Sequence, residues 1–287
     1  MKARAFNYVR ASTLMEALDA YEQAGSDASY IAGGQSLVPA LALRLQAPDV
    51  LIDIAHIPDL RGIELKGNWL RIGALTRHAE VLADPLIRQH APLYSDAAPH
   101  VAHPAIRNKG TLGGSIAHAD PASEFPAMTL ALGAELEIAN RNGTRRVPAD
   151  AFFVDLFQTA IEPGELLVAI HVPVVNANHR WAFHELARRR GDYALVGCGV
   201  LAEIVDGAAA DMGIVFFSVG NTPLRARNAE QALIGRPLNE ETIAAAQAAV
   251  VLDLDPPEDD TVPPAMRRHL ARVVLGRLLG DIARQAP

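Results

Sequence analysis

Two adjacent glycines near the start of the chain are the first residues whose types could do chemistry. They lie in Ala32-Gly33-Gly34-Gln35-Ser36-Leu37, between a short apolar run and a segment that reads as the first turns of a helix. Residues without a Cβ atom let the chain turn sharply and let backbone N–H groups approach a bulky anion. A helix start adds favourable partial charge, and the Ser36 hydroxyl can donate one more hydrogen bond. The stretch therefore predicts a phosphate cradle.

A second double glycine strengthens this prediction. Thr111-Leu112-Gly113-Gly114-Ser115 repeats the device about eighty residues later, again with a serine after the glycines. One Gly-Gly pair alone is most often a tight turn, and neither the Walker pattern nor the GxGxxG spacing fits these positions. We therefore expect two glycine loops that meet on opposite sides of one pyrophosphate.

Histidine and cysteine offer little further chemistry. His100 and His103 are spaced closely enough to share a metal, but no cysteine joins them and His118 is an uncertain third ligand. We expect no metal site there. The single cysteine, Cys198, lies among valines and glycines, which favours a buried strand position over a nucleophile. One cysteine excludes an internal disulfide and a cluster ligated by cysteines of this chain.

Composition narrows the class of protein. Of the 287 residues, 50% are apolar and 21% charged, which is ordinary for a protein with a substantial core. The formal net charge of -7 argues against nucleic acid as a partner, because phosphate-backbone binders present a basic face. The N-terminal residues lack the apolar core of a signal peptide, and no apolar run reaches membrane-spanning length. We therefore expect a cytoplasmic protein without a membrane span.

The elements around the first motif follow from local signals. Thr13 and Glu16 fit a capping box, and apolar residues then share one helical face until Gly25, which predicts a helix over 13–24. Strands are expected over 29–32 and 50–54. The result is a β/α unit of about fifty-five residues, too small to hold a whole ligand site.

The elements around the second motif are less regular. Thr76 is expected to cap a short helix that runs through His78. Asn142-Gly143 is the strongest hairpin signal in the chain. The remaining expected segments are strands over 69–74, 134–139 and 166–172 and helices over 86–101 and 124–132.

The last third of the chain reads as a separate α+β module after a polar linker over 173–180. The segment 253–264 is rich in proline and aspartate and predicts a surface loop. The final helix is amphipathic, with its arginines expected on a solvated side and an apolar face made of Leu270, Val273, Val274, Leu278 and Ile282. The elements expected in this module are strands over 181–188, 194–205 and 213–219 and helices over 239–252 and 264–284.

Four longer segments connect these motifs to a known family. They are Ile72-Gly73-Ala74-Leu75-Thr76-Arg77-His78, the run from His103 to Ser115, Ala119-Asp120-Pro121-Ala122-Ser123, and the run from Glu185 to Ala194. With the first glycine motif, they make essentially the full chain resemble the FAD-binding medium subunit of the molybdenum hydroxylases, the family of carbon monoxide dehydrogenase and xanthine dehydrogenase.

The resemblance implies an α+β fold in two domains. Residues 1–175 would form a two-lobed FAD-binding domain of the PCMH type, similar to vanillyl-alcohol oxidase, with lobe one over about 1–55 and lobe two over about 56–175. Residues 176–287 would form a C-terminal domain of about three antiparallel strands and helices.

The resemblance also implies a set of FAD ligands and no catalytic residue of this chain. Asp120 would bond flavin hydroxyls or the ring edge, Tyr193 would lie over the isoalloxazine, and His78 would lie near the site. Gln35 stands where such proteins have Gln or His, and an amide cannot relay protons. The full implied set is Ala32, Gly33, Gly34, Gln35, Ser36, Leu37, His78, Thr111, Gly113, Gly114, Ser115, Asp120, Leu166, Leu167 and Tyr193.

Each of these residues has a structural alternative. Asp120 precedes a proline and could initiate a turn, which would be the preferred interpretation without the resemblance. Tyr193 could be a half-buried strand aromatic, and Leu166 and Leu167 could be core residues. His78 could pack on a helix.

The function implied is electron transfer. FAD on this chain would receive electrons from [2Fe-2S] clusters on a small partner, after substrate oxidation at a molybdenum cofactor on a large partner, in a dimer of heterotrimers. The substrate, the acceptor (NAD, a quinone or oxygen) and the stoichiometry are not set by the sequence. Two alternatives stay open, a flavin-less structural subunit and a stand-alone flavin oxidoreductase.

Overall fold

Lobe one is a three-stranded parallel sheet with two helices. In the computed structural model, which describes residues 2–259 and 262–285, the strand order is β1-β3-β2. The sequence did not predict β1, because all four of its residues are exposed and it lacks apolar alternation. The Tyr8 hydroxyl of β1 donates a hydrogen bond to Asp53 of β3. The elements are β1 (Asn7–Arg10), α1 (Leu14–Ala24), β2 (Ala28–Ile31), α2 (Leu37–Leu43) and β3 (Val50–Asp53).

The start of α1 was predicted correctly, with one change in its hydrogen bonds. The Thr13 hydroxyl accepts from the Glu16 N–H at 3.2 Å, as expected for the cap. The Glu16 carboxylate accepts from the Ser12 N–H at 2.7 Å, one residue before the partner that a capping box requires. The helix ends at Gly25, whose φ of +70° suits a residue without Cβ.

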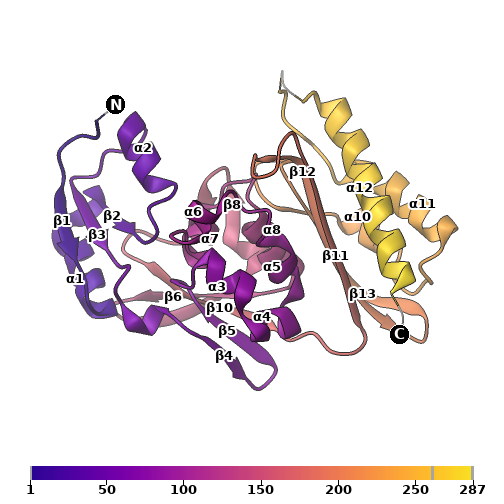
Figure 1. Cartoon of the computed structure of the whole chain (residues 1–287), viewed down its shortest axis with the longest axis horizontal. Helices are drawn as coiled ribbons and strands as arrows, with labels where there is room; N and C mark the ends of the chain where they lie inside the picture. The colour runs from indigo at the N-terminus through magenta and orange to yellow at the C-terminus, as the bar shows by residue number, and fades with distance from the viewer. Residues whose placement is uncertain (1, 260–261, 286–287) are drawn as a thin grey trace.

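Lobe two is a five-stranded antiparallel sheet, in the order β4-β5-β10-β6-β7, with helices α3 to α8 on one face (Figure 1). The predicted hairpin is present, but its two turn residues are Arg141 and Asn142, since Asn140 pairs with Gly143. The strand β4 was not predicted. The sheet consists of β4 (Ile63–Lys66), β5 (Trp69–Gly73), β6 (Glu135–Asn140), β7 (Gly143–Pro148) and β10 (Leu166–Pro173).

In lobe two one predicted helix is divided, and another is present with a different cap. The expected helix over 86–101 is two short helices separated at Ala91, because Pro92 begins the second and has no N–H to continue the first. The cap of α3 is Arg77 rather than Thr76, whose buried hydroxyl has no partner in the described part of the chain. The remaining elements of the lobe are α3 (His78–Ala83), α4 (Pro85–His90), α5 (Pro92–Ala97), α6 (Pro104–Arg107), α7 (Leu112–His118), α8 (Glu124–Ala131), α9 (Ala149–Phe152), β8 (Phe153–Asp155) and β9 (Gln158–Thr159).

The last third of the chain contains an antiparallel sheet in the order β11-β12-β13-β14. Two of the three helices of this module pack on the sheet. The three predicted strands are present, and β13 begins five residues earlier than expected. A short fourth strand and α10 were not predicted. The elements are β11 (His179–Ala187), β12 (Ala194–Val205), β13 (Ala208–Phe217), β14 (Leu224–Arg225), α10 (Arg227–Gln231), α11 (Glu240–Ala249) and α12 (Pro264–Arg284).

The apolar face of α12 is rotated from the predicted one. Leu270 and Val273 lie at its half-buried edge. Arg267 was expected on the solvated side, but its side chain is only 13% exposed and donates to the carbonyl of Leu195 at 3.1 Å and to that of Ser218. The buried residues of the helix are Ala271, Val274, Leu275, Leu278, Leu279 and Ile282.

Helix α8 joins lobe two to the last third of the chain. Its residues from Phe125 to Ala131 are all buried, as expected for a helix that is apolar on every side. The sheet of the last third of the chain approaches α8 closely, and this approach depends on glycines in the sheet. A Cβ on Gly213 would lie 2.6 Å from the Ala131 carbonyl oxygen, and one on Gly199 would lie 2.5 Å from the Met128 side chain. The two sheets therefore share a core through this helix.

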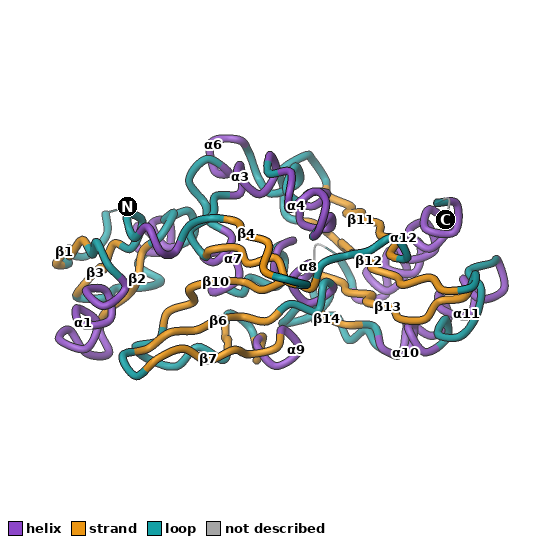
Figure 2. Tube along the Cα trace, turned by 90° about the horizontal axis from the view of Figure 1, so that it is seen from below, coloured by secondary structure: helices purple, strands orange, loops and turns teal. Residues whose placement is uncertain are grey.

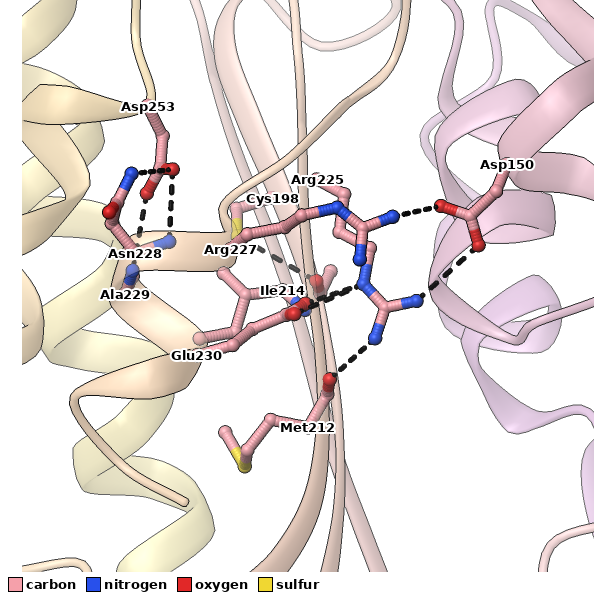
Figure 3. Close-up of polar contacts among 11 residues, drawn as sticks. Asp150, Cys198, Met212, Ile214, Arg225, Arg227, Asn228, Ala229, Glu230 and Asp253 are labelled. Atoms are coloured by element: carbon pink, nitrogen blue, oxygen red, sulfur yellow. Dashed lines mark hydrogen bonds and ion pairs between the residues drawn. The ribbon is translucent and has the colours of Figure 1, made fainter.

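A polar contact supports the same junction at the surface (Figure 3). Arg227 and Arg225 reach Asp150 of α9, at 2.8 and 3.6 Å. The Arg225 guanidinium also donates to Glu230 at 2.8 Å and to the Met212 carbonyl at 2.9 Å. The three modules lie in a row, with the described ends of the chain at opposite ends of the molecule (Figures 1 and 2).

Candidate functional site

A cleft of about 880 Å³ opens between lobe one and lobe two, and the loop 191–193 from the last third of the chain forms part of its wall. Its size is typical of a site for a large cofactor. Every predicted ligand except Asp120 lines it. The fourteen are Ala32, Gly33, Gly34, Gln35, Ser36, Leu37, His78, Thr111, Gly113, Gly114, Ser115, Leu166, Leu167 and Tyr193.

The first glycine motif contacts the segment that leads into the second. A Cβ built on Gly33 would lie 2.2 Å from the Lys109 carbonyl oxygen and 2.8 Å from the Gly110 Cα. Both distances are shorter than side chains tolerate, so only glycine allows the first motif to reach the segment that leads into the second. Both motifs line the same cleft, whereas their meeting on opposite sides of a pyrophosphate stays a prediction.

The first motif presents free backbone donors. Among the described residues, none accepts a hydrogen bond from the N–H groups of positions 33–36. Gly34 has a φ of +70°, which turns the chain, and its carbonyl accepts from the Val38 N–H at 3.0 Å. The Gln35 side chain donates to the Gly33 carbonyl at 3.1 Å and holds the turn closed. Successive unpaired N–H groups of this kind form an anion-binding nest.

The second motif is built differently from the expected loop. Gly113 and Gly114 lie in the first turn of α7, and neither has a positive φ. The Gly113 N–H donates to the Ala74 carbonyl at 2.9 Å, and the Gly114 N–H donates to the Thr111 hydroxyl at 3.2 Å. The backbone donors of positions 112–115 are therefore used by the protein, whereas the Thr111 N–H has no acceptor among the described residues. That N–H and the hydroxyls of Thr111 and Ser115 remain to serve a ligand.

Packing explains the glycines of this second motif. A Cβ on Gly113 would lie 2.5 Å from the Ala74 Cβ and 2.7 Å from the Ala74 carbonyl oxygen. On Gly114 the nearest atom would be the Thr111 hydroxyl at 2.7 Å, with open space otherwise. Gly113 is thus required by the sheet beneath the helix, whereas Gly114 faces the cleft.

His78 supports the second motif from the cleft wall. Its Nε2 lies 2.9 Å from the Thr111 carbonyl, and since that oxygen can only accept, Nε2 carries the proton. The ring packs edge-on against Phe125, with centroids 4.9 Å apart. Burial lowers the pKa of His78 to about 4, although the hydrogen bond to Thr111 opposes the shift. The imidazole is therefore neutral at physiological pH.

Asp120 lies beside the cleft and makes a turn. Its carboxylate accepts from the Ala122 N–H at 2.9 Å, the contact that its structural alternative requires. Tyr193 is 68% exposed, so it is not a half-buried strand aromatic. Surrounding protein atoms and the negative charge of Asp120 raise the pKa of Tyr193 to about 12. These two side chains therefore lie close together.

Leu166 and Leu167 are core residues and also line the cleft. Leu166 and Leu167 are 6% and 3% exposed, and each belongs to a buried core cluster. Both also contribute to the cleft surface. They form an apolar wall that the core holds rigid.

Sequence reasoning missed several wall residues. Tyr21 and Tyr30 stack with centroids 5.2 Å apart on the side of lobe one. Phe157, in the turn between β8 and β9, packs on His118 at 5.1 Å. Glu124 begins α8 at the edge of the cleft. Tyr30 could have been predicted from its position just before the first motif. The β8–β9 hairpin, which carries Phe157, has no local sequence signal that would indicate its position at the cleft.

The donors fit a dinucleotide with a pyrophosphate. The N–H nest suits phosphate oxygens, the hydroxyls of Ser36, Thr111 and Ser115 suit sugar or phosphate oxygens, and the leucine wall suits an apolar ring face. His100 contacts Glu185, and within residues 2–259 and 262–285 no group of three His, Cys, Asp or Glu side chains could hold a metal.

Comparison with known proteins places the chain among flavoproteins. A family model described as the FAD binding domain in molybdopterin dehydrogenase matches residues 4–175, and one described as the CO dehydrogenase flavoprotein C-terminal domain matches residues 181–282. The chain is 39% identical over 287 residues to the 6-hydroxypseudooxynicotine dehydrogenase complex subunit alpha of Paenarthrobacter nicotinovorans, covering 100% of this chain and 97% of that protein.

Solved structures agree over the whole chain. Carbon monoxide dehydrogenase from Hydrogenophaga pseudoflava, solved in a form that lacks the Mo-pyranopterin moiety of the molybdenum cofactor, superposes with a TM-score of 0.97 at 38% identity and covers 100% of both chains. Quinoline 2-oxidoreductase from Pseudomonas putida 86 superposes with a TM-score of 0.93 at 36% identity and covers 99% of both.

Proposed function

The chain belongs to the family of FAD-binding medium subunits of molybdopterin dehydrogenases, and on this premise we propose how its cleft holds the cofactor. It is the FAD-binding subunit of an oxidoreductase complex of the molybdenum hydroxylase type. The observation that supports our placement of FAD best is the row of free N–H groups at 33–36, which opens into a cleft of suitable size.

Each part of the cleft has a proposed task. The N–H groups of the first motif bind the pyrophosphate, and the hydroxyls of Thr111 and Ser115 bind oxygens on its other side. Leu166 and Leu167 hold one face of the isoalloxazine and Tyr193 lies over the ring; all three line the cleft. His78 fixes the Thr111 carbonyl and so orients the hydroxyl beside it. Asp120 acts from beside the cleft, through Tyr193 or a flavin hydroxyl.

The bound cofactor accepts and releases electrons singly or in pairs, while the protein binds it, orients it and tunes its electronics. This chain contributes no catalytic side chain of its own to substrate oxidation in our proposal. One cysteine cannot ligate an iron–sulfur cluster, so we propose that electrons arrive from clusters held on a partner chain.

The partners follow from the family. As a medium chain, the protein is one subunit of a complex with large and small partners. We propose that the large partner carries the molybdenum cofactor, that the small partner carries the [2Fe-2S] clusters, and that the assembly is a dimer of heterotrimers. We also keep the domain boundary near 175–180 as a proposal. No helix in the described residues is long and apolar enough to cross a membrane; a cytoplasmic location stays a prediction.

One experiment separates this function from its alternatives. The native complex is purified, its chains are weighed by mass spectrometry, and FAD released by denaturation is measured. One FAD per copy of this chain, with molybdenum and iron on partner chains, is the expected result. A colourless complex that takes up no added FAD would favour a structural subunit. Substrate turnover by the isolated chain would favour a stand-alone flavin oxidoreductase.

A further inference from the structure

Two tyrosines of lobe one form an aromatic surface in the cleft wall. Tyr21 of α1 and Tyr30 of β2 stack with ring centroids 5.2 Å apart and an angle of 26° between the ring planes. Both residues line the cleft, and both are half-buried rather than enclosed in the core of the lobe. The pair therefore offers aromatic surface to a molecule bound in the cleft.

The Tyr30 hydroxyl is the incomplete part of this surface. It is buried, but it has no hydrogen-bond partner among the described residues. A buried tyrosine hydroxyl ordinarily has a partner, because an unpaired polar group costs stability. Burial raises the pKa of Tyr30, so the hydroxyl keeps its proton and can donate. A bound molecule with an acceptor atom would supply the missing partner.

The tyrosine pair lies a short reach from the free N–H groups of the first motif. Tyr30 is three residues before Gly33, so even a fully extended chain separates them by only about 10 Å. On the other side of the pair, Gly164 has a φ of +85°, and a Cβ there would lie 3.5 Å from the Tyr21 ring. Residues 162–164 line the cleft as well. The pair and this loop therefore border the same part of the cleft.

The cleft thus has aromatic surface from two different modules. Tyr193 comes from the last third of the chain and the tyrosine pair from lobe one, and lobe two lies between these modules (Figure 1). FAD likewise carries two ring systems, one on each side of its pyrophosphate. With the isoalloxazine against Leu166, Leu167 and Tyr193, the adenine remains to be placed.

We propose that Tyr21 and Tyr30 form the platform on which the adenine of FAD stacks, and that the Tyr30 hydroxyl donates to an acceptor on the adenosine half. This inference rests on the proposed function. It gives the pair a role in selectivity, because FMN carries the same isoalloxazine but has no adenosine to stack. The chain would hold FAD in preference to FMN through these two rings.

The test compares complexes that carry the natural chain, Tyr30→Leu, Tyr30→Phe or Tyr8→Leu. Each complex is freed of flavin and titrated separately with FAD, FMN and ADP. Tyr8→Leu is the matched control, because Tyr8 is also a strand residue of lobe one but is 51% exposed and does not line the cleft. If no complex binds FAD, the proposed function itself fails, and that result is distinct from those below.

The three ligands separate stacking from general damage to the site. With Tyr30→Leu we expect FAD and ADP to bind roughly 10-fold more weakly, because base–aromatic stacking is lost, and FMN to bind as it does to the natural chain. Tyr30→Phe keeps the ring, so it should lose roughly threefold for FAD and ADP and nothing for FMN. Tyr8→Leu should bind all three normally. Unchanged binding of FAD and ADP in Tyr30→Leu, or an equal loss for FMN, would overturn the proposal.

Photolabelling locates the adenine without any variant. The natural complex, freed of flavin, is irradiated with 8-azido-ADP, and labelled peptides are identified by mass spectrometry. We expect the label on residues 21–31 or 162–164, and we expect excess FAD to suppress it. A label that FAD suppresses but that lies only on other segments would refute the platform.

Discussion

The two glycine motifs share a sequence pattern but have different structural roles. In the first motif, Gly34 has a positive φ and the N–H groups of positions 33–36 stay free. In the second, the backbone is helical and the N–H groups are bonded to Ala74 and Thr111. The first is therefore a donor site, and the second is a packing device that brings a helix against the sheet and offers hydroxyls.

This difference changes how the glycines are interpreted. Intact glycines alone do not indicate an intact ligand site, because Gly33 and Gly113 are needed by protein contacts. A flavin-less relative would have to keep them in order to fold. Gly114 faces the open cleft, so a glycine at this position is the one that indicates a bound ligand. Substitutions can test this division, from the largest expected effect to the smallest.

Gly33→Ala should have the largest effect. The new Cβ would meet the Lys109 carbonyl at 2.2 Å, so the lobes must separate. We expect a loss of stability of about 3 kcal/mol, at the upper end for overpacking, together with loss of FAD. The measurements are the free energy of unfolding and the FAD content. Gly220→Ala is the control, because its Cβ would meet nothing closer than 3.9 Å. Natural FAD content and stability in Gly33→Ala would show that the motifs are not in contact.

His78 should make stability depend on pH. Its pKa is lowered to about 4 in the folded chain, so the unfolded chain binds a proton at higher pH than the folded one does. Stability present at neutral pH should therefore be lost as pH falls from about 6.5 towards 4, by roughly 3 kcal/mol. Urea unfolding of the natural chain, His78→Gln and the exposed control His56→Gln measures this. An equal loss in all three would contradict the assignment.

Gly34→Ala should weaken FAD binding more than folding. A positive φ costs an alanine about 1–2 kcal/mol, and relaxing it would turn the N–H nest away from the cleft. Gly114→Ala is the paired variant in the second motif. Its Cβ would disturb the Thr111 cap and enter the cleft, at about 1 kcal/mol of stability. Titration with FAD checks both. If Gly114→Ala lost more affinity than Gly34→Ala, the roles of the motifs would be reversed.

Asp150→Asn should have the smallest effect. The Asp150 side chain is 43% exposed and contacts Arg225 and Arg227 at the junction with the last third of the chain. Exposed ion pairs contribute up to about 1 kcal/mol, and salt screens them. We expect a shift in thermal unfolding that is small and disappears at high salt, with natural FAD content. A loss of FAD would mean that the junction reaches the cleft.

The sequence predicted elements wherever a local signal sets them. Thr13 and Gly25 mark the ends of α1, alternation marks β6, and a continuous apolar run marks most of β10. Prediction failed where the signal is weak or overridden. The strand β1 is exposed throughout, and Pro92 divides a segment whose apolar periodicity continues across it.

The site could be predicted only in part for the same reason. The glycine motifs carry their own pattern, so their residues were found. Phe157 and Glu124 reach the cleft only because the β8–β9 hairpin and α8 fold against it. The residues next to them in the sequence form no pattern that predicts this packing. The conformation of Gly113 could not be predicted from the sequence either, because a Gly-Gly pair fits both a loop and the first turn of a helix.

A structure of the native complex with FAD bound tests the central claim most directly. We expect pyrophosphate oxygens within hydrogen-bond distance of the N–H groups of positions 33–36, with only the Thr111 N–H and the hydroxyls of Thr111 and Ser115 approaching them from the second motif. A pyrophosphate bound to the N–H groups of Gly113 and Gly114, or lying away from both motifs, would contradict it.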